Sequence, residues 1–164
     1  TATFVCSMSF VTEWSTSDQR NLVVFLPSVL KIFKSYRQQF FGQPEGGGIL
    51  LGRRRGKHLE VVLATEPNCT DRRAIFSFVR ETHGHADFAE QAWHQGGKTI
   101  DYLGEWHTHP QNVPTPSTID RNEWNKLARQ QPTSTLLVVV VGTNALHVEI
   151  IDNMGDKLLS PFDR

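Results

Sequence analysis

The sequence lacks the features that mark several large classes of protein. Its 164 residues include only two cysteines, no apolar run long enough to cross a membrane, and no excess of either charge, since 17 Lys and Arg balance 17 Asp and Glu. Cys6 and Cys69 lie far apart with no C-x-x-C, which argues against a disulfide scaffold and a zinc finger and favours a reducing compartment. A neutral chain also predicts no nucleic-acid partner and no membrane-binding face.

The N-terminal segment shows no signal-peptide pattern. It has no charged n-region, and polar residues such as Ser7, Ser9 and Glu13 interrupt its apolar positions. We therefore expect a cytoplasmic protein. The length suits a single domain over residues 1–164, with a core from about residue 21 to residue 152.

Apolar periodicity predicts an α/β fold (mixed α+β) in which a central mixed β-sheet is flanked by helices. Strands are expected at residues 21–25, 49–53, 59–64, 75–80, from residue 100, at 135–141 and at 146–152. One helix should begin at Pro27, a favoured first helical residue, and carry an apolar stripe as far as Phe40. Two more are expected at residues 88–93 and after Ser117.

The most informative stretch runs from His107-Thr108-His109 to Ser117 and Asp120, in the order H-x-H, seven residues, S-x-x-D. On an extended strand residues i and i+2 share a face, so both imidazoles should point the same way. Asp120, in the first turn of the following helix, could supply a third ligand. Three protein ligands with a fourth position open are typical of a catalytic zinc site.

Two further residues complete this candidate site. Ser117 resembles a helix cap followed three residues later by an acid, and capping is compatible with a role in the site. Glu45 precedes the glycine cluster 46–48, which permits close backbone approach, so its carboxylate could reach the site as a general base. A solvated loop acid is the plain alternative for Glu45, and Glu105 is the second choice as base.

Other histidines are weaker candidates. His83-Gly84-His85-Ala86-Asp87 repeats the H-x-H spacing and begins like a metallo-β-lactamase signature, but Phe88 stands where that pattern needs its next histidine. We expect a polar loop there, and surface or hydrogen-bonded roles for His58, His94 and His147. Ser117 as the nucleophile of a Ser-His-Asp triad lacks the G-x-S-x-G turn.

The chain resembles the JAMM (JAB/MPN) zinc metalloproteases, whose pattern is E-x-x-G-x-L-x-G followed by H-x-H-x7-S-x-x-D. Glu45, Gly48, Leu50 and Gly52 match the first part, and the four residues from His107 to Asp120 match the second. The resemblance implies a JAB/MPN-like (cytidine-deaminase-like) fold and Zn2+ held by His107, His109 and Asp120. It also implies Glu45 as base, Ser117 as oxyanion donor, and cleavage after the C-terminal tail of a ubiquitin-like protein.

A finer resemblance is to the bacterial JAB deconjugases of ubiquitin-like anti-phage (CBASS-type) operons, carried by the segments 67–73, 76–78 and 103–110. It implies release of a cGAS-like nucleotidyltransferase conjugate from its targets, with the tail lying beside the catalytic helix and the segment 69–99. Processing of another ubiquitin-like or sulfur-carrier protein remains open, as does an inactive MPN scaffold. The short connection between Asp120 and residue 135 leaves no room for a second, zinc-bearing insertion.

Overall fold

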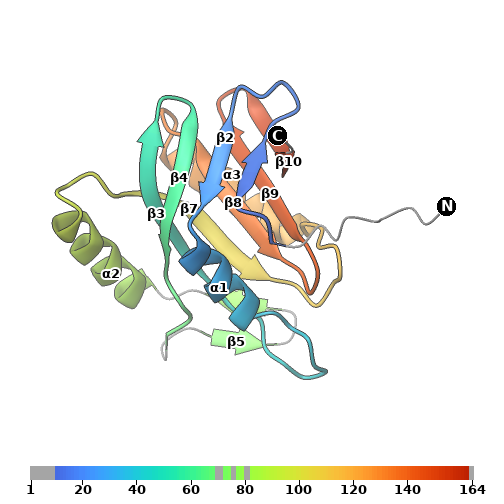
Figure 1. The fold of residues 1–164 in the computed structure, drawn as a ribbon. Coiled ribbons are helices and arrows are strands. Elements are labelled where there is room, and N and C mark those ends of the chain that lie inside the picture. Colours follow the sequence, from blue (N-terminus) through green and yellow to red (C-terminus); the bar gives the residue numbers. More distant parts are fainter. Residues whose placement is uncertain (1–9, 69–71, 75–76, 80–81, 163–164) are drawn as a thin grey trace.

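A computed structural model describes residues 10–68, 72–74, 77–79 and 82–162. Eight strands form one closed sheet in the order β1-β10-β9-β8-β7-β3-β4-β2, and β5 and β6 form a separate pair. Within the closed sheet, β2–β4 and β7–β8 are parallel pairs, whereas the other neighbours are antiparallel. The predicted mixed α/β class is therefore confirmed, although the central sheet is closed (Figure 1).

Most predicted elements appear close to their expected places. The strands are β2 (Leu22–Phe25), β3 (Gly47–Arg55), β4 (His58–Ala64), β7 (Asp101–Thr108), β8 (Leu136–Val141) and β9 (Leu146–Asp152). The helices are α1 (Pro27–Ser35), α2 (Thr82–Gln95) and α3 (Thr118–Gln130). The predicted strand 75–80 is described only at β6 (Ser77–Val79), which pairs with β5 (Arg72–Ala74). Residues 75, 76 and 80 lie outside the described residues, as do Cys6 and Cys69.

Two strands that the sequence does not predict close the sheet. β1 (Glu13–Ser15) and β10 (Gly155–Pro161) pair with each other through Trp14 and Pro161. β1 has only three residues, and β10 is largely exposed and ends at a proline, so neither shows a clear period-two apolar pattern. Each of the two becomes a strand because it pairs with the other, which lies far away in the sequence.

Helix α1 is shorter than its apolar stripe predicts. Val29 and Phe33 of this stripe are buried as expected, and Leu30 is buried beside them, but the helix ends at Ser35. Phe40 lies beyond it with 76% of its surface exposed, so the prediction that Phe40 belongs to the core stripe is wrong. The chain leaves the helix at Tyr36 and forms a loop in which Gln38 Nε2 donates to Gln43 O at 3.0 Å.

The core has three parts, which place the helices around the sheet. The interior of the closed sheet is filled by side chains of most strands and by α1. On the outer surface, α3 covers β8 and β9 through Trp124, while α2 covers β3 through Ala92, packed against Ile49 and Leu51. Strand β8 is buried at all six positions because both its faces are covered, which explains its continuous apolar run.

A bulge in β7 changes the alternation that the sequence predicts. Leu103, expected on the same face as the two imidazoles, is packed in the sheet interior together with Trp106. The β3–β7 register skips it, pairing Leu50 with Gly104 and Leu51 with Tyr102. A Cβ at Gly104 would lie 1.6 Å from the carbonyl oxygen of Leu137, so the close approach of β8 requires glycine there. The predicted period holds only from Gly104 onward.

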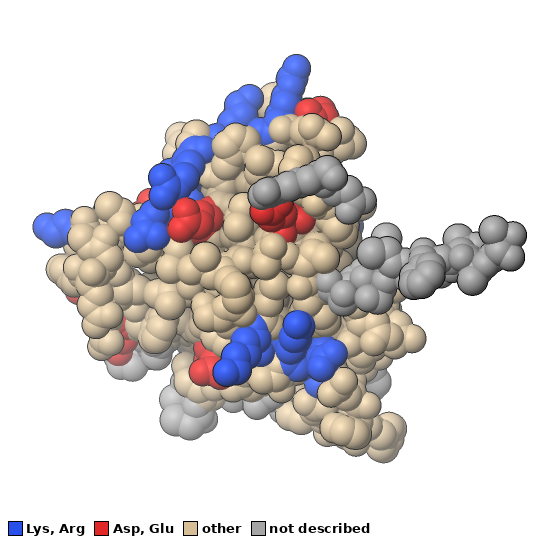
Figure 2. Space-filling model, viewed as in Figure 1, with Lys and Arg blue, Asp and Glu red and all other residues tan. Residues whose placement is uncertain are grey.

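Charges of both signs are mixed on the surface. In the view of Figure 2, Lys and Arg follow the β3–β4 hairpin and form a second group over α1, with acidic residues between them. In the hairpin, Arg53 and Arg55 pair with Glu60 at 3.4 and 3.1 Å. Among the described helices, none is long and apolar enough to cross a membrane.

Candidate functional site

The end of β7 and the start of α3 bring three candidate ligands together. His107 Nε2 lies 3.1 Å from His109 Nε2 and 3.3 Å from Asp120 Oδ1, and His109 Nε2 lies 3.3 Å from Asp120 Oδ2. Among the described residues, this is the group of His, Cys, Asp and Glu whose ligand atoms converge closely enough for one metal ion. The strand places the imidazoles on one face, as the sequence predicts, and the helix delivers the carboxylate.

The spacing of these atoms fits zinc. Four ligands placed tetrahedrally at about 2.0–2.1 Å from a zinc ion lie about 3.3–3.4 Å from one another. The imidazole nitrogens are 3.1 Å apart, and each lies 3.3 Å from a different oxygen of Asp120, so each contact is close to that value. The ligand side chains keep 15%, 14% and 16% of their surface exposed, so a fourth position on the solvent side is accessible. Nitrogen and carboxylate donors with one open position suit a catalytic zinc site.

Ser117 caps α3 and fixes the carboxylate in place. Its hydroxyl accepts a hydrogen bond from Asp120 N at 3.1 Å, and its backbone N–H donates to Asp120 Oδ2 at 2.7 Å. This capping box determines where the Asp120 side chain points. Because the Ser117 hydroxyl accepts in this arrangement, its own hydrogen can be donated elsewhere.

Glu45 lies just before β3, and Gly47, two residues on, pairs with His107. Only 5% of Glu45 is exposed. Burial raises the pKa of its carboxyl from 4.5 to about 7, while the charge of His109 lowers this pKa and the charge of Asp120 raises it. Because Gly47 pairs with His107, the backbone of Glu45 lies close to the strand that carries the imidazoles. A carboxyl with a pKa near neutrality is suited to accept and return a proton.

Asp120, in the first turn of α3, and His109, just after β7, stabilise each other's charge. Burial would raise the pKa of Asp120, but hydrogen bonds from His107 and His109 outweigh burial and hold this pKa well below its usual range. Burial lowers the pKa of His109, yet the contact with Asp120 outweighs it and the pKa is raised. A cation bound here would take the place of this proton, so metal affinity should fall at low pH.

Supporting residues around the site have no motif of their own in the sequence. Gln111 Oε1 lies 3.3 Å from His109 Nδ1 and accepts from Thr115 N at 3.0 Å, so it links an imidazole to the loop before α3. Arg121 donates to both oxygens of Glu149, at 3.3 Å each, which ties the first turn of α3 to β9. The sequence did not predict either residue. Arg121 has its partner on another element, β9, and the partners of Gln111 come together only through the fold of the loop before α3.

Gly48, in the predicted glutamate motif, has a clear steric role. A Cβ there would lie 2.3 Å from the carbonyl oxygen of Thr65. The glycine cluster therefore lets β3 approach the chain after β4, as the sequence predicts for this segment.

The other histidines whose side chains the structure describes do not join the site. His85 lies in the first turn of α2, where the sequence predicts a loop, and its Nδ1 lies 2.5 Å from the Thr65 hydroxyl. His147 contacts Glu149, and His58 Nδ1 accepts from Leu22 N at 3.1 Å. Glu105 lies half-buried on the face of β7 that carries His107.

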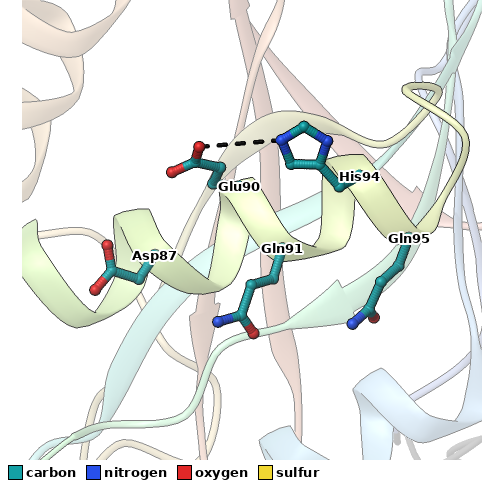
Figure 3. Close-up of a pocket in the computed structure, with 5 residues that line it drawn as sticks. All are labelled: Asp87, Glu90, Gln91, His94 and Gln95. Atoms are coloured by element: carbon teal, nitrogen blue, oxygen red, sulfur yellow. Dashed lines mark ion pairs between the residues drawn. The ribbon is translucent and has the colours of Figure 1, made fainter.

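A shallow hollow on the outer face of α2 is separate from the ligand group. It is lined by Asp87, Glu90, Gln91, His94 and Gln95, all on this one helix (Figure 3). His94 and Glu90 pair across it at 4.0 Å, both largely exposed. An exposed i,i+4 pair of this kind contributes little to stability and supplies no converging polar groups for a ligand.

The chain belongs to the family described as prokaryotic homologs of the JAB domain, which matches residues 32–151. This range contains all five candidate residues, and the family predicted from the sequence is confirmed. The chain is similar to a Pseudomonas aeruginosa protein named CD-NTase/cGAS isopeptidase, with 39% identity over 158 residues that make up 95% of this chain and 100% of the relative. Proteins of the same name from Vibrio cholerae and Escherichia coli are 38% and 36% identical, over 72% and 76% of this chain and 76% and 79% of their own.

The fold is also similar to a solved structure. The solution structure of a protein from Desulfitobacterium hafniense matches with a TM-score of 0.60, over 83% of this chain and 88% of that chain. At 18% sequence identity this likeness shows the shared fold alone.

Proposed function

We propose that the protein is a zinc-dependent isopeptidase that cleaves after the C-terminal tail of a ubiquitin-like protein. One observation carries the proposal: the two imidazoles lie 3.1 Å apart, each lies 3.3 Å from one oxygen of Asp120, and the buried carboxyl of Glu45 belongs to the chain that pairs with His107. The intact ligand set argues against an inactive scaffold. Residues 1–164 would act as one JAB domain.

His107, His109 and Asp120 would hold the metal. When bound there, zinc supplies a Lewis acid that lowers the pKa of water to about 7 and polarises a carbonyl. Glu45 would take the proton from the attacking water and pass it to the departing lysine amine, so that the proton is returned as the C–N bond breaks. Ser117 would donate its free hydroxyl hydrogen to the carbonyl oxygen as negative charge develops on it.

The names of the relatives suggest the substrate. They are called CD-NTase/cGAS isopeptidases, and the Pseudomonas aeruginosa protein matches over its whole length. We propose that this chain, in the cytoplasm, releases a cGAS-like nucleotidyltransferase joined through its C-terminus to target lysines, as part of anti-phage defence of the CBASS type. The tail would lie beside α3 and the segment 69–99, of which part lies outside the described residues.

The test uses purified protein and defined conjugates. The C-terminal segment of a cGAS-like nucleotidyltransferase is joined to the lysine of a fluorescent peptide by an isopeptide bond. Parallel substrates carry the same tail in linear fusion, or a sulfur-carrier tail. We expect release from the isopeptide conjugate, loss of release with a strong chelator, and recovery with zinc.

Two results would contradict the proposal. Cleavage that persists in metal-free protein would rule out a metalloprotease. Cleavage of the sulfur-carrier tail alone would move the protein to the processing alternative. Asp120→Ala serves as the matched control, since it should show neither bound zinc nor cleavage.

A further inference from the structure

Thr108, between the two imidazoles, has no part in the proposed chemistry, yet it is fully buried. Its hydroxyl accepts a hydrogen bond from Gly46 N at 2.9 Å and donates one to Gln38 Oε1 at 3.0 Å. Its backbone N–H donates to Gly46 O at 2.9 Å. Both polar backbone atoms of Gly46, the residue next to Glu45, are therefore bonded to Thr108.

The backbone bond from Thr108 N–H to Gly46 O continues the β3–β7 register, which pairs Gly47 with His107, by one residue. The bond from Gly46 N–H to the Thr108 hydroxyl is not part of that ladder and depends on the side chain. Strand β3 begins at Gly47, so Glu45 and Gly46 lie in the loop before it. Along β7 successive side chains alternate between faces, so His107 and His109 face the metal group while Thr108 points to the other side. One tripeptide thus supplies two metal ligands on one face and fixes the neighbour of the base on the other.

The direction of these hydrogen bonds is determined by their partners. Gln38 is buried, and its Nε2 donates to Gln43 O at 3.0 Å, which leaves Oε1 as the acceptor for the Thr108 hydroxyl. The hydroxyl oxygen then accepts from Gly46. On the other side of Gly46, a Cβ would meet the Tyr36 ring at 3.1 Å, so the ring already packs closely against this residue.

We propose that Thr108, oriented by Gln38, is a positioning residue that holds Glu45 in reach of the proton it must transfer. The proposal rests on the proposed function of Glu45 as base. Its physical reason is that the carboxyl group is carried by a loop, and a loop displacement of about 1 Å can lower a rate about 10²-fold. Zinc binding does not depend on Gly46, so the metal should be retained.

Three variants test this proposal. Thr108→Val removes the hydroxyl at nearly constant volume, and Thr108→Ser restores it. Thr16→Val is the matched control: Thr16 is also buried, donates to Asp18 Oδ1 at 2.6 Å and accepts from Asn21 N at 3.2 Å, but lies outside the site. We expect kcat on the isopeptide conjugate to fall about 10–10²-fold in Thr108→Val, with little change in KM and with zinc near one per chain. Thr108→Ser and Thr16→Val should remain close to the wild type.

A double-mutant cycle separates positioning from general damage. If Thr108 acts through Glu45, adding Thr108→Val to Glu45→Gln should lower the residual rate no further, because the positioned group is already gone. Equal losses in both backgrounds would overturn the proposal. Gln38→Met leaves the Thr108 hydroxyl in place but removes the acceptor that orients it, together with the donor to Gln43 O. If Thr108→Val fails to fold, Gln38→Met replaces it in the double-mutant cycle with Glu45→Gln, and we expect a smaller loss of kcat.

Amide hydrogen exchange gives a readout that needs no substrate. Exchange of the Gly46 N–H, followed by NMR, should accelerate in Thr108→Val and be restored in Thr108→Ser. Unchanged exchange at Gly46 would overturn the positioning role, whatever the activity. A wild type that cleaves no conjugate would instead contradict the proposed function, so the two failures are distinguishable.

Discussion

The chain contains two H-x-H sequences, and their backbones give them different surroundings. His107 and His109 lie on a strand, where residues i and i+2 share a face, and their Nε2 atoms are 3.1 Å apart. His83 and His85 lie in the first turn of a helix, where residues i and i+2 are separated by roughly 200° about the axis. His85 is 1% exposed and contacts the Thr65 hydroxyl.

The third partner completes the contrast. The strand motif receives the carboxylate of Asp120, which a capping box holds at 3.3 Å from each imidazole. His85 instead meets a hydroxyl that also accepts from Ile49 N at 2.8 Å. That arrangement connects α2 to β3 and to the end of β4, and among the described residues it belongs to no group that could hold a metal ion. In this chain, the H-x-H motif whose side chains converge with a carboxylate is the one with an extended backbone.

The largest expected effect comes from the same substitution in both motifs. His109→Gln should lower bound zinc to well below one per chain and reduce conjugate cleavage to background, because one of three ligands is lost. His85→Gln should keep zinc and cleavage, and lower the free energy of unfolding by about 1–3 kcal/mol, the usual effect of leaving a buried polar group unsatisfied. Elemental analysis, cleavage assays and urea denaturation measure both. Loss of zinc in His85→Gln would contradict the conclusion that only the motif at His107 and His109 holds the metal.

The next effect concerns the carboxyl beside the strand motif. Glu45→Gln should bind zinc normally and lower kcat about 10²–10⁴-fold with little change in KM, because it removes the proton acceptor and leaves the ligands intact. Glu105→Gln, on the same face of β7, is the control and should stay close to the wild type. If Glu45→Gln loses zinc, Glu45 is a ligand; if only Glu105→Gln loses activity, the base has been misassigned.

A smaller effect separates the two roles of Ser117. Ser117→Ala and Ser117→Gly both remove the hydroxyl, and each should retain zinc while slowing turnover by about 10²–10³-fold if that hydroxyl stabilises the oxyanion. As a cap, Ala should cost about 0.5–2 kcal/mol and Gly only a few tenths. Equal kinetic losses with unequal melting would support the oxyanion role. Near-normal turnover in Ser117→Gly would leave Ser117 as a cap alone.

How much the sequence could predict follows from how local each signal is. The strand alternation from Gly104 to His109 and the helix start at Ser117 depend on adjacent residues, so the convergence of His107, His109 and Asp120 could be predicted. The bulge at Leu103 appears only in the pairing of β7 with β3, and the bond from Arg121 to Glu149 joins α3 to β9. Contacts of that kind have no local pattern. Thr108 and Gln38 were missed for the same reason, since they are 70 residues apart.

The last expected effect, a change in stability and not in rate, tests the environment that distinguishes the strand motif, a buried carboxyl beside it. In metal-free protein the pKa of Glu45 is raised from 4.5 to about 7, chiefly by burial. Since the folded state has the higher pKa, it binds the proton more tightly than the unfolded state does. This contribution to stability is complete below pH 4.5 and is lost as the pH rises through about 7.

Gln cannot ionise, so Glu45→Gln should gain stability relative to the wild type across this interval and show a constant difference above it. Urea denaturation of both chelator-treated proteins, at several pH values from about 4.5 to 8, measures that difference. A difference that does not change with pH would mean that the Glu45 carboxyl is as well solvated in the fold as in the unfolded chain, and the strand motif would then lack the buried proton acceptor that sets it apart from His85.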